Sequence, residues 1–506
     1  MKKGKVYLVG GGPGALGLIS VRGLECLKKA DVIIYDRLLD KRLLDTVPPE
    51  VEKIYVGKMV GEHTKPQAEL NKLLVAKAGE GKTVVRLKGG DPFVLGRGGE
   101  EAEVLVQNHI PFEMVPGVTS AIAVPAYAGI PVTHRGLASS FAVITGHEDP
   151  TKDSSSINWE KLATGVDTLI FLMGMKNLTE MVVKLIEYGR PSSTPVAVIK
   201  EGTRAEQKTL VGSLENIVAK VKEQCLTPPA VIVVGEVVKL RERLRWFDNR
   251  ALFGKRVLVT RAQHQASALS RLLAEQGAQP IELPAINIQA VTDTRELDQA
   301  LSNLSNYQWL VFTSVNGVEA FWKRLHDLNM DSRALSGLQV GAIGPATAKA
   351  LEAQGVIPDF LPEIYTSEGI IDGLKSRNIA GLRILLPRAD IADKDLVQEL
   401  SRLGAEAHEV AAYQTVPAIE AITQARQMLI SGEIDVITFT SSSTVSNLMA
   451  VFSGELPVID GVKVACIGHK TADTATKAGL KVDIIAREQT IPGLVAAIEE
   501  YFRKEN

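Results

Sequence analysis

The sequence predicts an α/β protein that is divided into several units, and three observations carry this prediction. At 506 residues the chain is too long for a single hydrophobic core, since domains commonly span ~100–150 residues. Short β-branched runs that end in glycine turns and lead into helical patterns recur along the chain, which is typical of α/β units. The second half also repeats itself at a nearly constant offset, which predicts two related units there.

Composition and charge argue against several classes of protein. Apolar residues make up 45% and charged residues 23% of the chain, and the net charge of −2 argues against a nucleic-acid binder. No run approaches the ~18 apolar residues of a membrane span, and the N-terminal run is too short for a secretory signal, so we expect a cytoplasmic protein without a membrane partner. The eight histidines form no HxxxH pair, and Cys26, Cys225 and Cys466 lack metal-ligand spacing, so we expect mostly buried thiols and no metal site.

The first strand runs directly into a glycine-rich turn. A strand expected over Val6–Val9 is followed by Gly10–Gly14, a helical pattern, and a second strand over Val32–Tyr35 that ends at Asp36. This arrangement resembles a dinucleotide-binding fingerprint and supports a nicotinamide-dependent oxidoreductase as one reading. Pro13, however, has no backbone N–H to offer a phosphate in the middle of the turn. The turn therefore suits a ligand that needs no phosphate cradle.

The segment from Val84 to Glu101 carries two further glycine turns at the end of a predicted strand. The strand, expected over Thr83–Leu87, is followed by Gly89-Gly90-Asp91-Pro92 and then by a turn at Gly96–Gly99. Ligands bind beyond the carboxyl ends of strands in open α/β sheets, and glycines let the backbone approach them closely. We expect a ligand loop here, although an ordinary strand–turn–helix connection would leave the same pattern.

A second α/β lobe is expected after this segment. A proline–glycine turn at Val115–Gly117 leads into a helix of small residues, and further strands are predicted at Phe141–Thr145, Thr168–Met173, Val196–Lys200 and Ala230–Val234. Glycine-rich loops from both lobes could then line one cleft.

Six motifs of this half occur together and in order: VGGGPG, YDRLL, GKxxxEHxxPQxELN, GGDPFVLGRGGEE, PGVTSA and AYAGIPVTHR. Together they resemble the uroporphyrinogen-III C-methyltransferase branch of the S-adenosylmethionine-dependent tetrapyrrole methylases, over residues 4–240. The resemblance implies a two-lobed methylase fold around a cleft, a homodimer formed through this half, and methylation of two carbons of an acidic tetrapyrrole. Such a reaction needs alignment and a base rather than a metal.

The same resemblance implies roles for individual residues. Asp36 falls at the position of a proton acceptor and Lys58 at that of a proton donor. Because the implied substrate carries many carboxylates, the expected partners of these groups are Arg22, Arg37, Lys58, Arg97 and Arg135. Asp36 could instead be a simple cap, Lys58 a carboxylate-binding cation, and Met173 a core residue of its strand. The positions implied to contact S-adenosylmethionine are Pro13, Gly89, Gly90, Asp91, Val94, Thr119, Ser120, Met173 and Gly202.

The strand pattern stops near residue 240, and charged residues with Trp246 and Phe247 follow. We expect a linker over 241–254 that separates a first domain, 1–240, from a second, 255–506. In the second domain, Arg256–Arg261 matches Arg383–Arg388, an offset of 388 − 261 = 127. Residues 312–314 match 439–441 at the same offset, which predicts two α/β units built by duplication.

Two classes fit such a duplicated pair of units. One is a solute-binding protein, which the N-terminus argues against. The other is uroporphyrinogen-III synthase, which the motifs VTRAxxQAxxLxxxLxxxG, WLVFTSVNGVEAF, AIGPATAKAL, LLPRAD, AAYQTV, FTSSSTV and CIGHKTADTA resemble when taken together. That family implies two flavodoxin-like lobes, 255–288 plus 417–506 and 289–416, joined by a ribbon near 285–290 and 411–416.

The synthase resemblance implies an enzyme without a cofactor that closes hydroxymethylbilane to uroporphyrinogen III with inversion of the last ring. Holding one folded conformation of the substrate would be its main task. By this resemblance, Tyr413 is the candidate that helps the hydroxyl group of hydroxymethylbilane to leave. The family also implies hydroxyl side chains at strand–helix turns as contacts of substrate carboxylates, and these are Ser314, Thr347, Ser441 and Thr471. Each of them could instead be a helix N-cap. The two halves are thus expected to catalyse consecutive steps on small-molecule tetrapyrroles.

Overall fold

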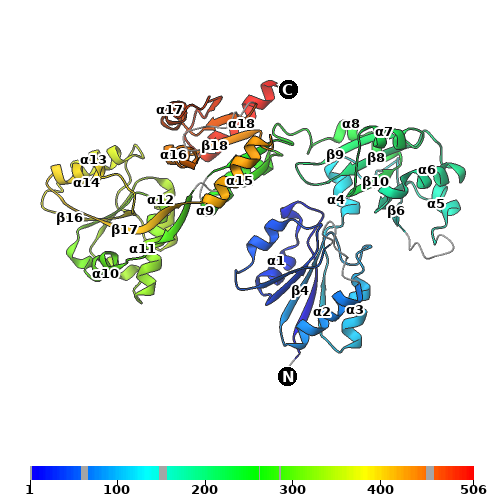
Figure 1. The fold of residues 1–506 in the computed structure, drawn as a ribbon, viewed down its shortest axis with the longest axis horizontal. Coiled ribbons are helices and arrows are strands. Elements are labelled where there is room, and N and C mark those ends of the chain that lie inside the picture. Colours follow the sequence, from blue (N-terminus) through cyan, green and yellow to red (C-terminus); the bar gives the residue numbers. More distant parts are fainter. Residues whose placement is uncertain are drawn as a thin grey trace. The chain divides into compact units, whose positions relative to one another are not determined.

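The computed structural model describes residues 3–57, 67–147, 156–260, 263–283, 286–451 and 461–505 (Figure 1). The chain divides into two compact units: Met1–Arg256 with Leu273–Gln279 and Glu499–Asn506, and Val257–Leu272 with Pro280–Ile498. Each unit contains two five-stranded sheets within the described residues. Over these same residues, no helix combines the length and the apolar character that crossing a membrane requires.

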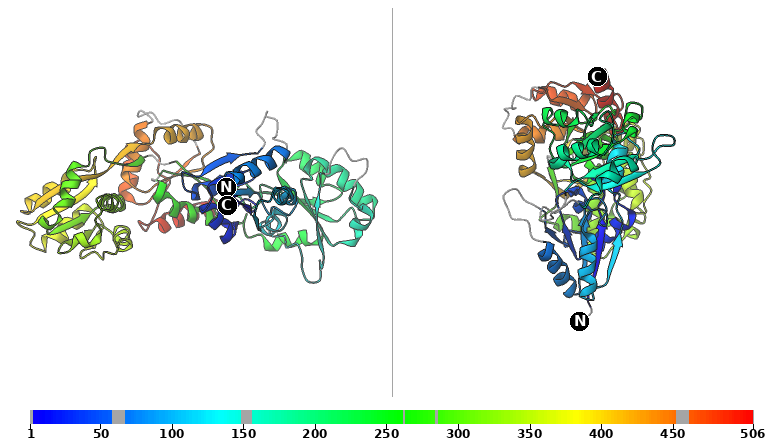
Figure 2. Two further views of the ribbon diagram at one scale, coloured as in Figure 1. Left: turned by 90° about the horizontal axis from the view of Figure 1, so that it is seen from below. Right: turned by 90° about the vertical axis from the view of Figure 1, so that its right-hand side faces the viewer.

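The first sheet is parallel throughout, in the order β3-β2-β4-β1-β5. Apolar residues on both of its faces are buried, as expected for a parallel sheet covered on each side. Helices α2 and α3 lie on one face of the sheet and α1 on the other (Figures 1 and 2). Leu70, Leu74 and Leu105 belong to the core of the first face, and Leu27 belongs to that of the second. The elements are β1 (Lys5–Gly10), α1 (Val21–Lys28), β2 (Val32–Tyr35), β3 (Glu52–Tyr55), α2 (Gln67–Gly79), β4 (Thr83–Lys88), α3 (Gly98–Gln107) and β5 (Phe112–Val115).

The second sheet is mixed, in the order β6-β7-β10-β8-β9. Strands β6 and β7 are parallel, whereas β10 is antiparallel to both of its neighbours and β9 is antiparallel to β8. The strand β9 was missing from the sequence prediction because its pattern is short and half-exposed. The elements are α4 (Ser120–Tyr127), β6 (Phe141–Thr145), α5 (Trp159–Gly165), β7 (Thr168–Leu172), α6 (Leu178–Glu187), β8 (Pro195–Lys200), β9 (Lys208–Ser213), α7 (Ile217–Glu223) and β10 (Ala230–Val234).

The segment predicted as a linker is packed against the end of α4. After the short helix α8 (Arg241–Leu244), the Trp246 indole N–H donates to the carbonyl of Ala126, and the Phe247 ring lies 4.7 Å from that of Tyr127. Arg241 forms a buried ion pair with Asp248. The two aromatic side chains of this segment therefore dock on the end of α4.

The two sheets of the second unit have orders β12-β11-β18-β19-β20 and β13-β17-β16-β14-β15. The described pairings are parallel except for β13 with β17, which form an antiparallel ribbon. The strands are β11 (Arg256–Val259), β12 (Gln279–Glu282), β13 (Ile286–Ala290), β14 (Trp309–Phe312), β15 (Gln339–Ala342), β16 (Arg383–Ala389), β17 (Glu406–Pro417), β18 (Val436–Phe439), β19 (Lys463–Cys466) and β20 (Ile484–Ile485).

Strands that correspond in the sequence repeat are exchanged between these two sheets. By the repeat, β11 corresponds to β16, β14 to β18, and β15 to β19. In one sheet β11 lies beside β18, which is followed by β19, and in the other β16 lies beside β14, which is followed by β15. Among these corresponding strands, each sheet therefore combines the first strand of one repeat with the two later strands of the other.

Helices of the second unit follow the strands in the manner of α/β units. Phe321 and Trp322 of α11 pack with Phe312 of β14 on one face of the sheet, and Leu374 of α13 packs with Trp309 on the other. The helices are α9 (Gln263–Glu275), α10 (Arg295–Ser302), α11 (Val315–Asp327), α12 (Pro345–Ala353), α13 (Ser367–Lys375), α14 (Asp395–Arg402), α15 (Ile419–Ile430), α16 (Ser442–Val451), α17 (His469–Lys477) and α18 (Ile491–Glu505).

Candidate active sites

A cleft of about 720 Å³ in the first unit is lined by loops from both of its sheets. Volumes of this size are usual for small-molecule sites. Asp36 lines the cleft at the carboxyl end of β2, as the sequence placed it. Seven of the nine predicted cofactor positions also line it: Pro13, Gly89, Gly90, Val94, Ser120, Met173 and Gly202.

Glycines let three loops meet at the floor of this cleft. The backbone N–H of Gly90 donates to the carbonyl of Gly12 over 2.7 Å, which joins the turns after β1 and β4. A Cβ at Gly10 would lie 2.5 Å from the Cα of Gly117, and one at Gly117 would lie 2.2 Å from the carbonyl oxygen of Gly90. No side chain fits between these loops, so the wall of the cleft here is backbone.

Asp91 and Thr119 are absent from the lining of the cleft and support its loops instead. The two carboxylate oxygens of Asp91 accept hydrogen bonds from the backbone N–H groups of Phe93 and Gly117, at 2.8 and 3.0 Å. The hydroxyl of Thr119 accepts from the N–H of Ala121 and caps α4. Both residues hold the backbone that forms the wall.

Unusual backbone conformations gather at the rim of the cleft. Met173, Glu201 and Leu95 line it, and their φ angles are 59°, 47° and 53°. Residues in this left-handed region are often found at functional sites, where the surrounding structure holds them. Met173 is 53% exposed, so the alternative reading of this residue as part of a strand core is wrong.

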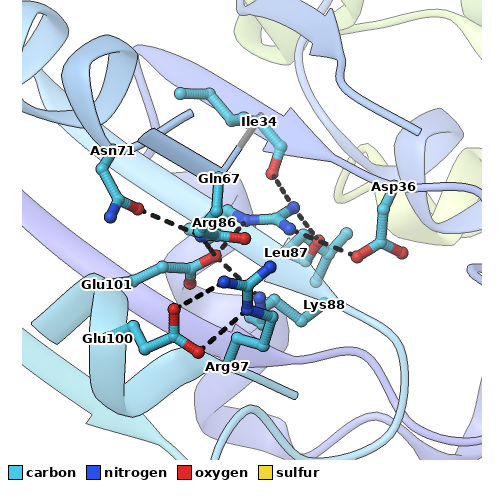
Figure 3. Close-up of polar contacts among 10 residues, drawn as sticks. All are labelled: Ile34, Asp36, Gln67, Asn71, Arg86, Leu87, Lys88, Arg97, Glu100 and Glu101. Atoms are coloured by element: carbon cyan, nitrogen blue, oxygen red, sulfur yellow. Dashed lines mark hydrogen bonds and ion pairs between the residues drawn. The ribbon is translucent and has the colours of Figure 1, made fainter. Parts of the chain in front are cut away.

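Asp36 lies at one end of a cluster of buried charged side chains (Figure 3). Its Oδ2 is 3.4 Å from a terminal nitrogen of Arg86, whose Nε is 3.3 Å from Oε1 of Glu101. The Nζ of Lys88 lies 2.8 Å from the same Glu101 oxygen. The Arg86, Lys88 and Glu101 side chains are 5%, 6% and 0% exposed, against 29% for Asp36.

The charges of this cluster balance one another. Burial lowers the pKa of the Lys88 ammonium, and the Arg86 guanidinium lowers it further, whereas the Glu101 carboxylate raises it. Glu101 lies in the first turn of α3, where the helix dipole favours a negative charge. Two cations and two carboxylates therefore lie together, and only Asp36 and Lys88 of the four line the cleft.

Of the arginines expected to bind substrate carboxylates, Arg37 lines the cleft, whereas Arg22, Arg97 and Arg135 lie outside its lining. Arg97 is exposed, has a φ of 60°, and pairs with Glu100 over 2.7 Å. Arg135 is also exposed. Lys58 lies outside the residues that the structure describes.

The lining residues that sequence reasoning missed include Lys88, Val124, Glu201 and Arg204. Lys88 is the last residue of β4, directly before the predicted ligand loop, and a charged residue in a buried strand was a usable signal. Arg204 reaches the first lobe, where its guanidinium donates to the carbonyl of Leu38. No sequence pattern indicated this contact between the lobes.

In the second unit, the Tyr413 hydroxyl lies 3.2 Å from Oγ of Ser314. A bulge in β17 causes this orientation: Arg388 pairs with Ala411 but Ala389 pairs with Tyr413, so Ala412 is skipped. Tyr413 is 7% exposed, and Ser314 accepts a hydrogen bond from Gly317 as the N-cap of α11. The structure thus brings two of the predicted synthase residues together.

The other predicted hydroxyls differ in accessibility. Oγ of Ser441 accepts from the backbone N–H of Thr444 and is partly exposed, so it has the position of an N-cap. Thr347 and Thr471 are only 3% and 5% exposed, and their helices are capped at Gly344 and Gly468 without a side-chain bond. The N-cap reading is therefore correct for Ser314 and Ser441 and wrong for Thr347 and Thr471.

Two further properties of the described residues bear on the chemistry. No group of three or more His, Cys, Asp or Glu side chains among them could hold a metal ion. Cys26 and Cys466 are buried, as expected, and Cys225 is exposed; all three are free thiols.

The fold and its sites define a two-part α/β enzyme, with a small-molecule cleft between the lobes of one part and a duplicated pair of lobes in the other. Residues 5–218 match the family Tetrapyrrole (Corrin/Porphyrin) Methylases, and residues 267–496 match the family Uroporphyrinogen-III synthase HemD. The chain belongs to both families and is a fusion of an N-terminal tetrapyrrole methylase with a C-terminal uroporphyrinogen-III synthase.

Known relatives align with different shares of this chain. The porphyrin biosynthesis protein HemD of Ruminiclostridium josui is 39% identical over 500 residues, which are 99% of this chain and 98% of that protein. A uroporphyrinogen-III C-methyltransferase of Bacillus subtilis is 43% identical over 357 residues, 71% of this chain and 73% of that one. The crystal structure of uroporphyrin-III C-methyl transferase from Thermus thermophilus complexed with S-adenyl homocysteine is 38% identical, covers 47% of this chain and 100% of that chain, and has a TM-score of 0.41.

Proposed function

We propose that this chain carries out two consecutive steps of tetrapyrrole biosynthesis. The C-terminal half closes hydroxymethylbilane to uroporphyrinogen III with inversion of ring D and loss of water. The N-terminal half then methylates uroporphyrinogen III at C2 and C7 with S-adenosylmethionine, to give precorrin-2. The observation that carries the methylase assignment is the cleft that holds Asp36 opposite a glycine-built wall, in a half that belongs to the methylase family.

The cleft fits S-adenosylmethionine better than it fits a dinucleotide. The loop after β1 has Pro13 in place of a donor N–H, and the walls combine backbone with apolar side chains such as Val94 and Met173. S-adenosylmethionine supplies a methyl group on a positively charged sulfur. Backbone carbonyls and a nearby carboxylate suit such a ligand, and Pro13, Gly89, Gly90, Val94, Ser120, Met173 and Gly202 are the residues proposed to hold it, with Asp91 and Thr119 bracing their loops.

Asp36 is proposed as the base that removes a proton from the methylated ring carbon, and Lys58 as a proton donor. Asp36 is suited to this role because its carboxylate is in contact with a cation, Arg86, and lines the cleft. The lining also carries four cationic side chains against two carboxylates, although the whole chain has a net charge of −2. This local excess of positive charge favours binding of an acidic tetrapyrrole. The cations are Arg37, Lys88, Lys176 and Arg204, and the carboxylates are Asp36 and Glu201. Arg97 and Arg135 remain proposed carboxylate partners at the surface.

In the synthase half, Tyr413 is proposed to help the hydroxyl group of hydroxymethylbilane to leave. Its hydroxyl is held by Ser314, at the carboxyl end of β14, where the N-terminus of α11 favours an anion. Ser441 is proposed as a carboxylate contact at the equivalent turn of the other repeat. Thr347 and Thr471 are so buried that contact with a substrate would require their surroundings to move.

We also propose how the chain is divided into domains and how it assembles. The first domain is taken as 1–240 with 241–254 as its docked connector, and the second as 255–506 with lobes 255–288 plus 417–506 and 289–416. The antiparallel pairing of β13 with β17 supports the ribbon between these lobes. A homodimer through the methylase half and a cytoplasmic location belong to the proposal as well.

A coupled assay tests both activities on the full chain. With hydroxymethylbilane alone we expect uroporphyrinogen III, and with S-adenosylmethionine added we expect a dimethylated product. Symmetric type-I product would contradict the synthase assignment. Tight NAD binding together with no binding of S-adenosylmethionine would contradict the methylase assignment and favour the oxidoreductase reading.

A further inference from the structure

Glu101 is a buried carboxylate that the proposed chemistry does not use. Its side chain is fully buried, yet Oε1 accepts from three donors: Lys88 at 2.8 Å, Arg86 at 3.3 Å and Gln67 at 3.3 Å (Figure 3). Its other oxygen, Oε2, has no hydrogen-bond partner among the described residues. A buried charge is costly unless it is paired, so this side chain is held in place by the two cations that it attracts.

The same two cations lie next to Asp36. Arg86 spans the distance between the carboxylates, with Nε toward Glu101 and a terminal nitrogen toward Asp36. Its remaining terminal nitrogen donates to the carbonyls of Ile34 and Leu87, which fixes the plane of the guanidinium. Asp36 has only this one contact from Arg86, since its Oδ1 has no hydrogen-bond partner in the part of the chain that is described.

We propose that Glu101 is a positioning residue for methyl transfer, which orients Arg86 and offsets the charge of Arg86 and Lys88 at Asp36. The proposal rests on the proposed role of Asp36 as the base. Glu101 does not line the cleft, so it acts on the reaction through Arg86 and Lys88. Without the negative charge of Glu101, the two buried cations Arg86 and Lys88 would be balanced only by the carboxylate of Asp36.

Two substitutions should move the pH profile of methylation in opposite directions, which a purely structural role of Glu101 would not cause. Glu101→Gln removes an anion from the cluster, so we expect the acid side of the pH profile of methylation to move down. Arg86→Met removes the cation that contacts Asp36, so we expect the acid side of the profile to move up. The other charged groups of the cleft within the described residues are unchanged by both substitutions: Arg37, His147, Lys176, Glu201 and Arg204.

The experiment measures methylation of uroporphyrinogen III by the full chain from pH 5 to 9 at saturating S-adenosylmethionine. We expect the midpoint of the acid side to move by ~1 pH unit in each variant, in opposite directions. Affinity for S-adenosylhomocysteine should stay within about twofold, because neither Glu101 nor Arg86 lines the cleft. Asp248→Asn is the matched control, since it breaks the buried ion pair with Arg241, which is not part of the cleft, and should leave the midpoint in place.

Midpoints that stay unchanged, or that move in the same direction, would overturn the positioning role. If Glu101→Gln does not fold, Lys88→Met and the double variant Lys88→Met/Glu101→Gln provide the test. The single variant should move the midpoint up, and the double variant should return it toward that of the unaltered protein; a double variant that matches the single one would overturn the proposal. Asp36→Asn is measured alongside, because an unchanged profile in that variant would remove Asp36 as the base and leave the methylase assignment itself intact.

Discussion

Gly202 lies against Val124 so closely that a Cβ at position 202 would be 2.4 Å from a methyl carbon of Val124. Gly202 follows β8 and Val124 belongs to α4, and both line the cleft. Valine has one strongly preferred side-chain conformation in a helix, so it cannot turn away. The close approach of these two residues shapes this part of the cleft.

We therefore expect Gly202→Ala to weaken binding of S-adenosylhomocysteine by about tenfold, because overpacking commonly costs ~1–3 kcal/mol. Isothermal titration calorimetry measures the affinity. The double variant Gly202→Ala/Val124→Ala should recover most of it, since the smaller side chain makes room. Gly165→Ala is the control, because nothing lies within 4 Å of a Cβ at that position. Equal affinity in the Gly202→Ala variant would contradict the contact.

Loss of the buried Glu101 charge should lower the free energy of unfolding. Removing one partner of a buried ion pair leaves the other charge unpaired and commonly costs ~3–5 kcal/mol, so Glu101→Gln should be destabilised by about 3 kcal/mol. The neighbouring Glu100 provides a matched control, since its pair with Arg97 is 52% and 57% exposed. Glu100→Gln should change stability by less than ~1 kcal/mol. Urea unfolding of both variants tests the prediction, and similar losses of unfolding free energy in the two variants would contradict it.

Tyr413→Phe should slow closure of hydroxymethylbilane by the order of 10²-fold, as expected for loss of a proton-transfer group. The ring stays in the core, so the fold should persist, and circular dichroism checks this. Tyr307→Phe is the control: that hydroxyl is 2.6 Å from Nδ1 of His408 and is not among the proposed synthase residues. An unaltered rate of uroporphyrinogen III formation in the Tyr413→Phe variant would exclude the proposed role.

Only one thiol should react with Ellman's reagent in the native protein at pH 8. Burial raises the pKa of Cys466 to about 11 and raises that of Cys26, so both stay protonated and shielded, whereas Cys225 is exposed. Three thiols should react in guanidinium chloride. In the Cys225→Ser variant the native signal should disappear; fast labelling that persists would mean that Cys26 or Cys466 is accessible.

Local patterns predicted much of the site because strand ends are local features. The β-branched runs before Asp36 and Gly89 placed both residues at the carboxyl ends of strands, and both line the cleft. The role expected for Asp91 differs, because its carboxylate is used by backbone N–H groups from its own loop and from Gly117. Whether a side chain faces a ligand or braces a loop depends on a neighbour that is distant in the sequence.

The sequence by itself determined the α/β class, the two families, the duplication in the second half, and the strands that end at the cleft. These follow from periodicity, turn residues and ordered motifs, all of which are written within short stretches of chain. Tertiary structure alone decided the exchange of strands between the two repeats and the grouping of Arg86, Lys88 and Glu101 beneath Asp36. The physical reason is that strand pairing and the burial of charge are long-range effects: β11 needs β18 beside it, and each buried cation needs a carboxylate from another element.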